Sequence, residues 1–502
     1  FGSSLFGSRG RGRQPAADSR TLSPLAGMAE DAPESTACDA MAGAPTGSLL
    51  GARRRDLTPP PRPCLQTPAS SKDACSPPPP SKGGPAAKEE AKGGPPAKEE
   101  AKEFGGPAGA LSIIVGSHVL MFLMASSLYG GGWEAFMPTP KSVAWLLAYH
   151  ASQYVFARLM PGVWVKGLSG LGYWCNGYCT LYATVAGTLM LHWTGVFDLT
   201  DLVNDYPAFL TTAVILGDIY SVIVHVRFAR AGQRWSIYDF FIGVETHPRI
   251  GMVDVKMVAE TRVSWTLLFL VTLGSFMATS RRLDTWMNPS AFMLLAHGLY
   301  ANACAKGEHF IPYTWDISTE KFGWMLCWWN LAGVPLLYCY QSLFLAKYAW
   351  DGLLLPPVPR EAYYGVLVVA LLLSYWIWDE ANYHRCYFRM EQRGEILSRR
   401  LFPTFRHVRD PKYIKCDEGV LLIDGWYSHA RKIPYTADAA MALLWGLSCG
   451  FSSALPFFYF AFFAAMITHR AGRDEARCRK KYGATWDKYI KAVPYRFIPK
   501  VY

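Results

Sequence analysis

Several familiar sequence signatures are missing from this chain of 502 residues. Its twelve cysteines are scattered and include no CxxC pair, so we expect buried thiols and neither a disulfide framework nor a metal site. No GxGxxG follows a predicted strand, which argues against a Rossmann dinucleotide-binding domain. The first residues contain no basic segment followed by an apolar core, so no signal peptide is expected there.

Aromatic residues are scarce in residues 1–108, which are rich in Pro, Gly, Ala, Ser, Lys and Glu. A segment of this composition cannot bury enough apolar surface to offset the entropy lost on ordering. The near-duplicate KGGPAAKEEAKGGPPAKEEAKE is low-complexity sequence rather than a structural repeat. We therefore predict a disordered segment over 1–108 and a folded domain over 109–502.

Long apolar runs recur throughout the folded domain, separated by short polar segments. Runs near 20 residues are long enough to cross a bilayer as helices. The predicted fold is therefore an all-α polytopic membrane protein with about ten transmembrane helices, and a large soluble helical protein is the alternative. The runs lie at roughly 110–129, 143–160, 171–193, 208–226, 263–279, 290–304, 323–347, 363–378, 437–450 and 451–468, of which 290–304 and 437–450 are short enough for half-helices or a hairpin.

The net charge of +11 fits loops attracted to anionic lipid better than nucleic-acid binding. A basic cluster directly follows the last apolar run, and cytosolic loops of membrane proteins are enriched in Lys and Arg. The C-terminus is therefore predicted to be cytosolic. The cluster comprises Arg470, Arg473, Arg477, Arg479, Lys480 and Lys481.

Three basic and aromatic clusters occur near the predicted cytosolic ends of the late spans. In WDEANYHRCYFR, Arg385 and Arg389 are four residues apart and share a helix face, where two guanidinium groups suit a phosphate or pyrophosphate. Ordinary interfacial anchoring is the alternative for this pair.

The second cluster lies in LLIDGWYSHARKIPYTADAA. Gly425 permits a tight turn and Tyr427 offers a flat face for stacking. Four further side chains recur at helical spacing, and the last is a carboxylate at the edge of an apolar run, where a lone charge is costly. An internal ion pair between Arg431 and Asp438 is the alternative. The four are Arg431, Lys432, Tyr435 and Asp438.

The third cluster is RDEARCRKKYGATWDKY. Asp474 and Cys478 are four residues apart, and Tyr482 and Tyr489 are seven apart, which would place both tyrosines on one helical stripe. Such a stripe flanked by bases could hold a nucleotide or simply anchor the helix at the interface. Together the three clusters predict one dinucleotide site within 380–502.

A fourth region, LLAHGLYANACAKGEHFIPYTWDISTEKFG, is dense in ionisable groups for an apolar environment. Such groups mark a functional site more often than not. A metal site is a poor interpretation, because Glu308 and His309 are adjacent and lack a matching ligand motif.

These stretches resemble the membrane sterol reductases of ergosterol and cholesterol synthesis, the ERG4/ERG24 family. The similarity covers roughly 110–502 and includes AHGLYANACAKGEH, LLIDGWYSHARKIPYTAD, RDEARCRKKYGATWDKY and VPYRFIPKVY. LYANACAKGEH and GWYSHARK are most similar to the fungal-type delta-24(24(1))-sterol reductase branch. This chain departs from the delta-14 and delta-7 branches at Pro434, where they carry Asn or His.

The resemblance implies an NADPH-dependent enzyme of the endoplasmic reticulum membrane with ten spans, a sterol substrate and other sterol-pathway enzymes as candidate partners. Arg431 and Lys432 are expected to face the cofactor phosphates. The other cofactor contacts that the resemblance implies are Arg385, Arg389, Leu422, Tyr427, Pro434, Tyr435, Asp474, Cys478, Arg479, Lys480, Lys481, Tyr482 and Tyr489.

The implied reaction is reduction of a sterol carbon–carbon double bond, for this branch the C-24(28) methylene in the last step of ergosterol-type synthesis. An isolated alkene accepts hydride only after protonation, so a buried acid is needed, and burial keeps a carboxyl protonated. Glu308 and Asp316 are the first candidates for that acid, followed by Tyr313 and Asp438; a helix cap or a paired charge is the alternative for each.

Three alternatives remain open at this point. Reduction at C14 or C7 needs the same acid and hydride donor. The C-terminal third also resembles membrane isoprenylcysteine methyltransferases, which bind a different cofactor. A non-catalytic sterol-binding receptor is the option outside enzymes, and the low-complexity N-terminal segment disfavours it.

Overall fold

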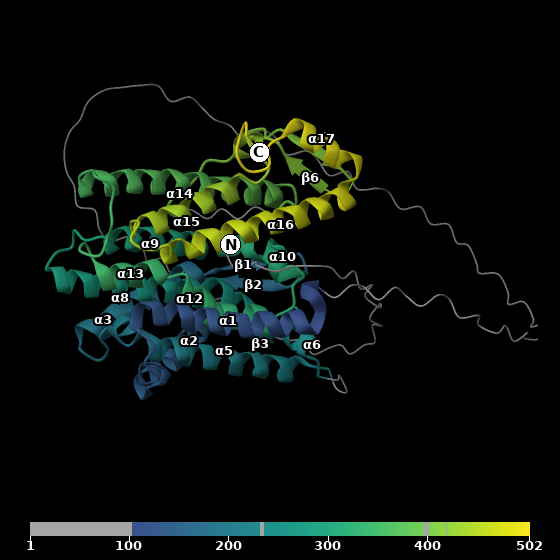
Figure 1. Ribbon diagram of the computed structural model, residues 1–502. Helices are drawn as coiled ribbons and strands as arrows, with labels where there is room; N and C mark the ends of the chain where they lie inside the picture. The colour runs from purple at the N-terminus through teal and green to yellow at the C-terminus, as the bar shows by residue number, and fades with distance from the viewer. Residues whose placement is uncertain (1–102, 231–234, 396–400, 418, 502) are drawn as a thin grey trace, which may run out of the picture. The chain divides into compact units, whose positions relative to one another are not determined.

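The computed structural model describes residues 103–230, 235–395, 401–417 and 419–501, and most of these residues are helical (Figure 1). Disorder was predicted for residues 1–108, and residues 1–102 of this segment lie outside the described residues. Helix α1 begins at Gly106, slightly before the predicted domain boundary at residue 109.

Nine of the ten predicted apolar runs correspond to one long helix each among the described residues. The run at 171–193 starts in a strand before its helix. These helices are α1 (Gly106–Tyr129), α2 (Pro140–Leu159), α3 (Gly177–Trp193), α5 (Tyr206–Phe228), α8 (Ser264–Leu283), α9 (Ser290–Lys306), α14 (Arg360–Glu391), α15 (Ile433–Leu447) and α16 (Phe458–Tyr482).

The tenth run, 323–347, is not one regular helix. It divides into α11 (Trp324–Trp328), the π-helical segment η5 (Trp329–Gly333), α12 (Val334–Leu337) and α13 (Tyr340–Tyr348). Pro335 lies inside this run and has no backbone N–H for a regular helical hydrogen bond, which favours a local break.

Shorter elements connect the long helices. The α- and π-helical ones are α4 (Asp201–Asn204), α6 (Ile237–Ile242), α7 (Val255–Val258), the π-helical η3 (Ala259–Val263), α10 (Trp315–Ser318) and α17 (Ala484–Ala492). The 3-10 helices are η1 (Glu103–Gly105), η2 (Trp133–Phe136), η4 (Gly307–Tyr313), η6 (Gly425–Ser428) and η7 (Leu455–Phe457). The described residues also contain three antiparallel hairpins, so the all-α prediction holds only for the bulk of the domain. They are β1 (Val163–Lys166) with β2 (Gly172–Cys175), β3 (Arg249–Ile250) with β4 (Val253–Asp254), and β5 (Tyr413–Cys416) with β6 (Gly419–Leu422).

Four described helical segments are long and apolar enough to cross a membrane. This supports a membrane protein, while the predicted count of ten spans exceeds the four that meet this length and hydropathy requirement. The four are Glu103–Tyr129, Tyr206–Phe228, Val255–Leu283 and Arg360–Glu391.

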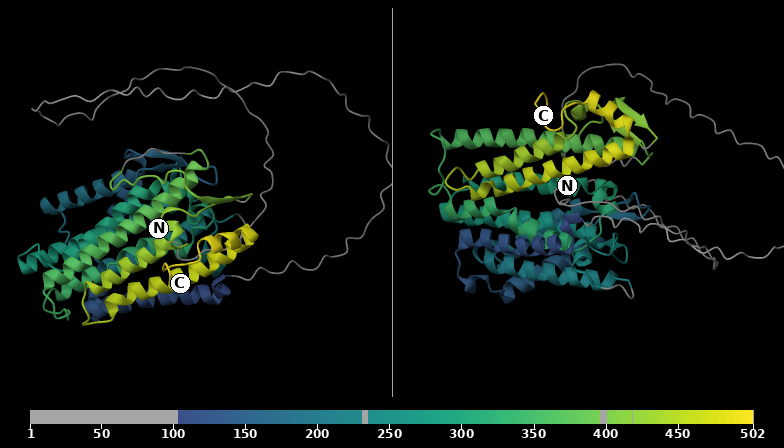
Figure 2. Two further views of the ribbon diagram at one scale, coloured as in Figure 1. Left: turned by 90° about the horizontal axis from the view of Figure 1, so that it is seen from above. Right: turned by 45° about the vertical axis from the view of Figure 1, so that its right-hand side comes forward.

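The late helices α14, α15 and α16 run side by side (Figures 1 and 2), with α15 packed against both of the others. Trp445 of α15 is buried at 1% exposure, and its ring centroid lies 5.1 Å from that of Tyr459 on α16 and 4.6 Å from that of His297 on α9. Aromatic packing of this kind fixes α15 between its neighbours. At the end of α16, Gly483 has a φ of 51°, which turns the chain into α17.

Candidate functional site

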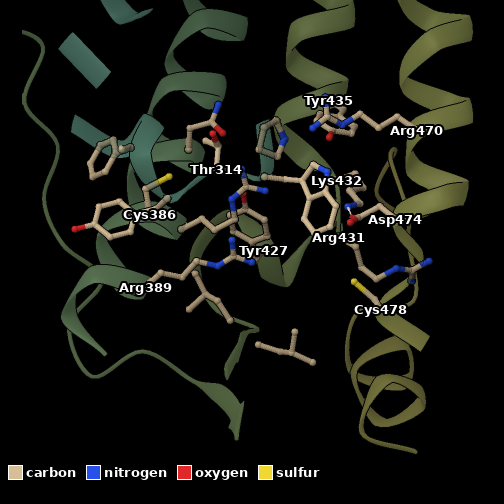
Figure 3. Close-up of a pocket in the computed structure, with 18 of the residues that line it drawn as sticks. Thr314, Cys386, Arg389, Tyr427, Arg431, Lys432, Tyr435, Arg470, Asp474 and Cys478 are labelled. Atoms are coloured by element: carbon tan, nitrogen blue, oxygen red, sulfur yellow. Dashed lines mark hydrogen bonds and ion pairs between the residues drawn. The ribbon is translucent and has the colours of Figure 1, made fainter. Parts of the chain in front are cut away.

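A cavity of about 280 Å³ opens where the C-terminal halves of α14 and α16 meet β6, the start of α15, and α17. Residues of η4 and α10 line the cavity from the other side. Figure 3 shows Arg389 extending from the α14 side toward Tyr427, with Asp474 and Cys478 opposite them on α16. The three basic and aromatic clusters of the sequence therefore meet in one cavity.

Most of the predicted cofactor residues line this cavity. They are Arg385, Arg389, Leu422, Tyr427, Arg431, Lys432, Pro434, Tyr435, Asp474, Cys478, Tyr482 and Tyr489. Helix α14 carries the first two one turn apart, as their spacing predicts. The guanidinium carbon of Arg385 lies 5.9 Å from the ring centroid of Tyr427.

Arg431 and Lys432 lie in the turn before α15, not on the helix as their spacing suggested, because the helix begins only at Ile433. Pro434 occupies its first turn, where a missing N–H leaves no helical hydrogen bond unmade. Arg431 donates from Nη1 to the carbonyl oxygens of Val493 and Pro494, at 2.7 Å each. It thereby ties the C-terminal segment to the cavity wall.

Lys432 forms an ion pair with Asp474 that joins the start of α15 to α16. Burial opposes ionisation of Asp474, but Lys432 outweighs it and holds the pKa of this carboxyl below its usual range. Arg477 lies 3.9 Å from the other oxygen of the same carboxylate. Asp474 therefore orders two cations at the cavity wall.

Tyr482 and Tyr489 do not share one helical stripe, because α16 ends at Tyr482 and Tyr489 belongs to α17. Trp486 lies between their rings, with centroids 6.2 Å from Tyr482 and 5.0 Å from Tyr489. Both tyrosines still reach the cavity. The two tyrosines therefore come together because the chain turns at Gly483, and not because they are spaced along one helix.

Three predicted cofactor residues lie apart from the cavity lining. Arg479, Lys480 and Lys481 are exposed, and Arg479 makes a solvent-exposed ion pair of 3.8 Å with Asp487. Lys481 lies over the ring of Tyr482 at 4.8 Å. Successive residues of a helix point in different directions, so residues 479–481 of α16 face solvent while Cys478 faces the cavity.

Glu308 also lies apart from the cavity lining. It is fully buried, and its Oε1 accepts a hydrogen bond of 2.7 Å from Nε of Arg262. The backbone N–H of Gly177 donates to its Oε2 at 2.7 Å, and Thr261 donates to Oε1 at 3.0 Å. These contacts occupy both oxygens of Glu308, which is paired with Arg262 and does not face this cavity.

The other three predicted acids line the cavity. Asp316 forms an ion pair with Arg470, whose Nη2 lies 3.8 Å from its Oδ2. Burial raises the pKa of Tyr313 to about 12, so this phenol remains neutral. Asp438 is buried, and the hydroxyl of Tyr300 donates to its Oδ2 at 3.3 Å.

Sequence reasoning missed several lining residues. Arg470 and Arg477 belong to the basic cluster that predicted a cytosolic C-terminus, and neither was predicted as a cofactor contact. The Arg477 guanidinium carbon lies 4.6 Å from the ring centroid of Trp315. Glu260 projects from the π-helical segment η3 with its Oε1 buried and without a hydrogen-bond partner among the described residues. The helical spacing of 470, 474 and 477 was the available signal for the arginines.

The donors around this cavity fit a phosphorylated ligand. Nε of Arg385 and the hydroxyl of Tyr427 are both buried, and neither has a hydrogen-bond partner among the described residues. Such groups are costly unless a ligand or water satisfies them. Arginine side chains around the same space supply the charge and geometry that phosphate oxygens require.

The fold and the cavity together define a helical membrane protein with one cavity lined by several arginines. The model of the ergosterol biosynthesis ERG4/ERG24 family matches residues 125–502, so the chain belongs to this family of sterol reductases. The resemblance inferred from the sequence is thereby confirmed.

Individual relatives agree with this assignment. The chain is 37% identical over 442 residues to the delta(24(24(1)))-sterol reductase of Gibberella zeae, covering 80% of this chain and 73% of that protein. It is 37% identical over 441 residues to the delta(24(24(1)))-sterol reductase erg4A of Aspergillus fumigatus, covering 79% and 92%. It is 32% identical over 373 residues to a delta(14)-sterol reductase of Methylotuvimicrobium alcaliphilum, covering 72% and 82%.

Proposed function

We propose that this protein is an NADPH-dependent reductase of the sterol side chain, acting on the C-24(28) methylene in the last step of ergosterol-type synthesis. The observation that carries the proposal is that one cavity is lined both by the arginines of α14 and by the buried carboxyl of Asp438. The two relatives named for delta(24(24(1)))-sterols support the position of the bond.

In this proposal the cofactor phosphates bind Arg385 and Arg389, whose spacing gives two guanidinium groups on one side of α14. Tyr427 supports Arg385 by stacking, and Lys432 and Arg477 remain in place through Asp474. NADPH, when bound, supplies the hydride. The number of arginines favours NADPH over NADH, because the additional 2′-phosphate rewards further cationic contacts.

Asp438 is the proposed proton donor. Its surroundings include Tyr300 and Trp378, whose rings stack at a centroid distance of 4.8 Å. No ion pair to Asp438 is found in the described part of the chain. A buried carboxyl that lacks a counter-cation is favoured in its neutral form, which can donate a proton.

In this reaction the proton from Asp438 is transferred first and the hydride from the cofactor second. Proton transfer from Asp438 to the terminal methylene carbon would leave a tertiary cation at C24, and hydride addition at C24 would then complete a methyl-bearing side chain. Asp438 regains its proton from solvent. The sterol therefore enters the cavity with its tail first, so that C24 lies between the carboxyl and the cofactor.

We further propose ten transmembrane spans in the endoplasmic reticulum membrane, with the C-terminus in the cytosol. The helices on the ten apolar runs and the basic cluster in the C-terminal half of α16 support this arrangement. The partners in this proposal are the sterol substrate, the lipid bilayer and other enzymes of the sterol pathway.

Complementation tests the proposal. The full chain is expressed in yeast strains that each lack one sterol reductase, and sterols are identified by mass spectrometry. Rescue of the strain that accumulates 24(28)-methylene sterols is the expected result. Rescue of a delta-14-deficient strain instead would assign the protein to the reaction named for its Methylotuvimicrobium alcaliphilum relative, and rescue of a delta-7-deficient strain would assign it to C7.

A further inference from the structure

A second cavity of about 270 Å³ lies between the end of α2, the β1–β2 hairpin, β4 and the helical segment from α7 into η3. It shares no lining residue with the cavity described above. The π-helical segment η3 separates them, since Glu260 lines the first cavity and Arg262 lines the second. Nothing in the proposed reduction uses this second space.

Arg262 contributes an unused hydrogen-bond donor to the second cavity. Its Nε and Nη2 atoms lie 2.7 Å from Oε1 of Glu308, and Nη2 donates to the carbonyl oxygen of Trp174 at 3.1 Å. These contacts fix the guanidinium plane. Nη1 is buried and has no hydrogen-bond partner among the described residues, although the residue is only 3% exposed.

Asp254 contributes an unused acceptor to the same cavity. Its Oδ1 accepts a hydrogen bond of 2.9 Å from the backbone N–H of Met257 and caps α7. Its Oδ2 is buried without a hydrogen-bond partner in the described residues. The nearest cation, Nε of Arg249, lies 3.8 Å away, which is too long for a hydrogen bond.

The remaining walls are largely apolar. Met160, Met257 and Trp174 contribute to them, and large hydrophobic side chains stand exposed at the rim, with Leu159 at 72% and Trp164 at 50% exposure. An exposed aromatic and aliphatic rim is typical of a surface that meets lipid. The charged lining residues are Arg158, which is exposed, and the buried Arg262 and Asp254. The cavity thus combines an apolar approach with one buried donor and one buried acceptor.

The buried cation of Arg262 and the buried anion of Asp254 together determine which polar group a ligand can place in this cavity. An anionic head would face Asp254, and a cationic head would face Arg262, so either would meet a buried like charge. A neutral hydroxyl can accept from Arg262 and donate to Asp254. We infer that the second cavity binds a neutral lipid with a hydroxyl head, a chemistry shared by sterols and diacylglycerols.

Photolabelling of the full-length protein in phospholipid nanodiscs tests this inference. Two probes are used, a sterol with a ring diazirine and a free 3-hydroxyl, and a diacylglycerol with a diazirine in one acyl chain. Labelled peptides are mapped by mass spectrometry. We expect at least one probe to label peptides from 157–174 or 252–258, which contain no lining residue of the first cavity, and the probe that does so identifies the source of the hydroxyl.

Two comparisons decide whether the hydroxyl is recognised. The unlabelled parent lipid should compete, whereas its methyl ether, which cannot donate to Asp254, should compete about tenfold less well. Asp254→Asn keeps the capping oxygen and removes the acceptor, so it should weaken labelling about tenfold, while Asp284→Asn at the exposed end of α8 should not. Thermal unfolding midpoints establish that both variants are folded.

Labelling needs no turnover, so its result is independent of the proposed reductase activity. The inference is overturned if neither probe labels these peptides. It is also overturned if the methyl ether competes as well as the parent lipid, because recognition of a hydroxyl would then be absent. The ether comparison uses the unmodified protein and so remains decisive if Asp254→Asn does not fold.

Discussion

The hydroxyl of Tyr300 on α9 lies 3.3 Å from Oδ2 of Asp438 on α15, and both side chains are buried where the two helices meet. A neutral hydrogen-bond donor such as the Tyr300 hydroxyl does not neutralise the charge of a carboxylate. Glu308 differs, because Arg262 occupies its carboxylate from 2.7 Å. This difference in partners is what directs the proposed acid role to Asp438.

Replacing Asp438 tests that role. Asp438→Asn should lower kcat about 100- to 10,000-fold with little change in the KM for NADPH, because general acid catalysis is lost while the phosphate contacts remain. Initial rates with a 24-methylene sterol provide the measurement. Asp316→Asn is the matched control and should alter KM more than kcat, since Asp316 pairs with Arg470. A wild-type kcat for Asp438→Asn would remove it as the donor.

The arginines of α14 should control cofactor affinity. Arg385→Ala or Arg389→Ala should raise the KM for NADPH about 10- to 100-fold, equivalent to about 1.5–3 kcal/mol for a lost charge-assisted hydrogen bond. Arg479→Ala is the control, because this arginine is exposed and lies apart from the cavity lining. Equal KM values for all three variants would return the α14 arginines to a role in membrane anchoring.

The ion pair between Glu308 and Arg262 should act on stability. Glu308→Gln leaves a buried guanidinium without its counter-ion, which should cost about 3–5 kcal/mol and lower the thermal unfolding midpoint in detergent. Asp487→Asn, which breaks the exposed pair with Arg479, should change stability by less than about 1 kcal/mol. A Glu308→Gln protein that kept its stability but lost turnover would reinstate Glu308 as a catalytic acid.

Glu320, in the loop between α10 and α11, should make stability depend on pH. Burial raises the pKa of Glu320 from 4.5 to about 7, against an opposing hydrogen bond from the Trp315 indole. Between these values the folded state holds a proton that the unfolded state has lost, so stability falls as the pH rises from 4.5 to about 7 and stays reduced above that.

Glu320→Gln removes this ionisation and keeps an oxygen for the indole hydrogen bond. The variant should be more stable than wild type at pH 8 by on the order of 1–3 kcal/mol, and equally stable below pH 4.5. Unfolding midpoints of both proteins across this range provide the test. A constant difference at every pH would show that ionisation of Glu320 is not its cause.

Local patterns were sufficient for much of the fold. Apolar runs predicted the long helices because hydropathy is a property of consecutive residues, and the spacing of Arg385 and Arg389 placed both on one side of α14. The run at 323–347 misled this approach, since average hydropathy does not register the break around Pro335.

The way the site residues come together could not be predicted from local patterns, because it depends on tertiary contacts and on turns of the chain. Arg262 precedes Glu308 by 46 residues, so no local pattern predicts that the two are paired. The same holds for Asp438, whose environment is set by residues distant in the sequence. The turn at Gly483 brings Tyr489 back to the cavity from a separate helix. In contrast, the helical spacing along α16 could have been used as a signal, because it places Arg470 and Arg477 on the cavity side and residues 479–481 on the solvent side.

The most direct test of the account follows both hydrogens into the product. Membranes containing the full chain are supplied with a 24(28)-methylene sterol and NADPH that carries deuterium at both C4 positions of the nicotinamide, in ordinary water. The account predicts a reduced sterol with one deuterium at C24 and none on the new methyl group, as located by mass spectrometry and NMR. Deuterium on the methyl carbon, or reduction of a delta-14 sterol while the methylene sterol is left unchanged, would contradict it.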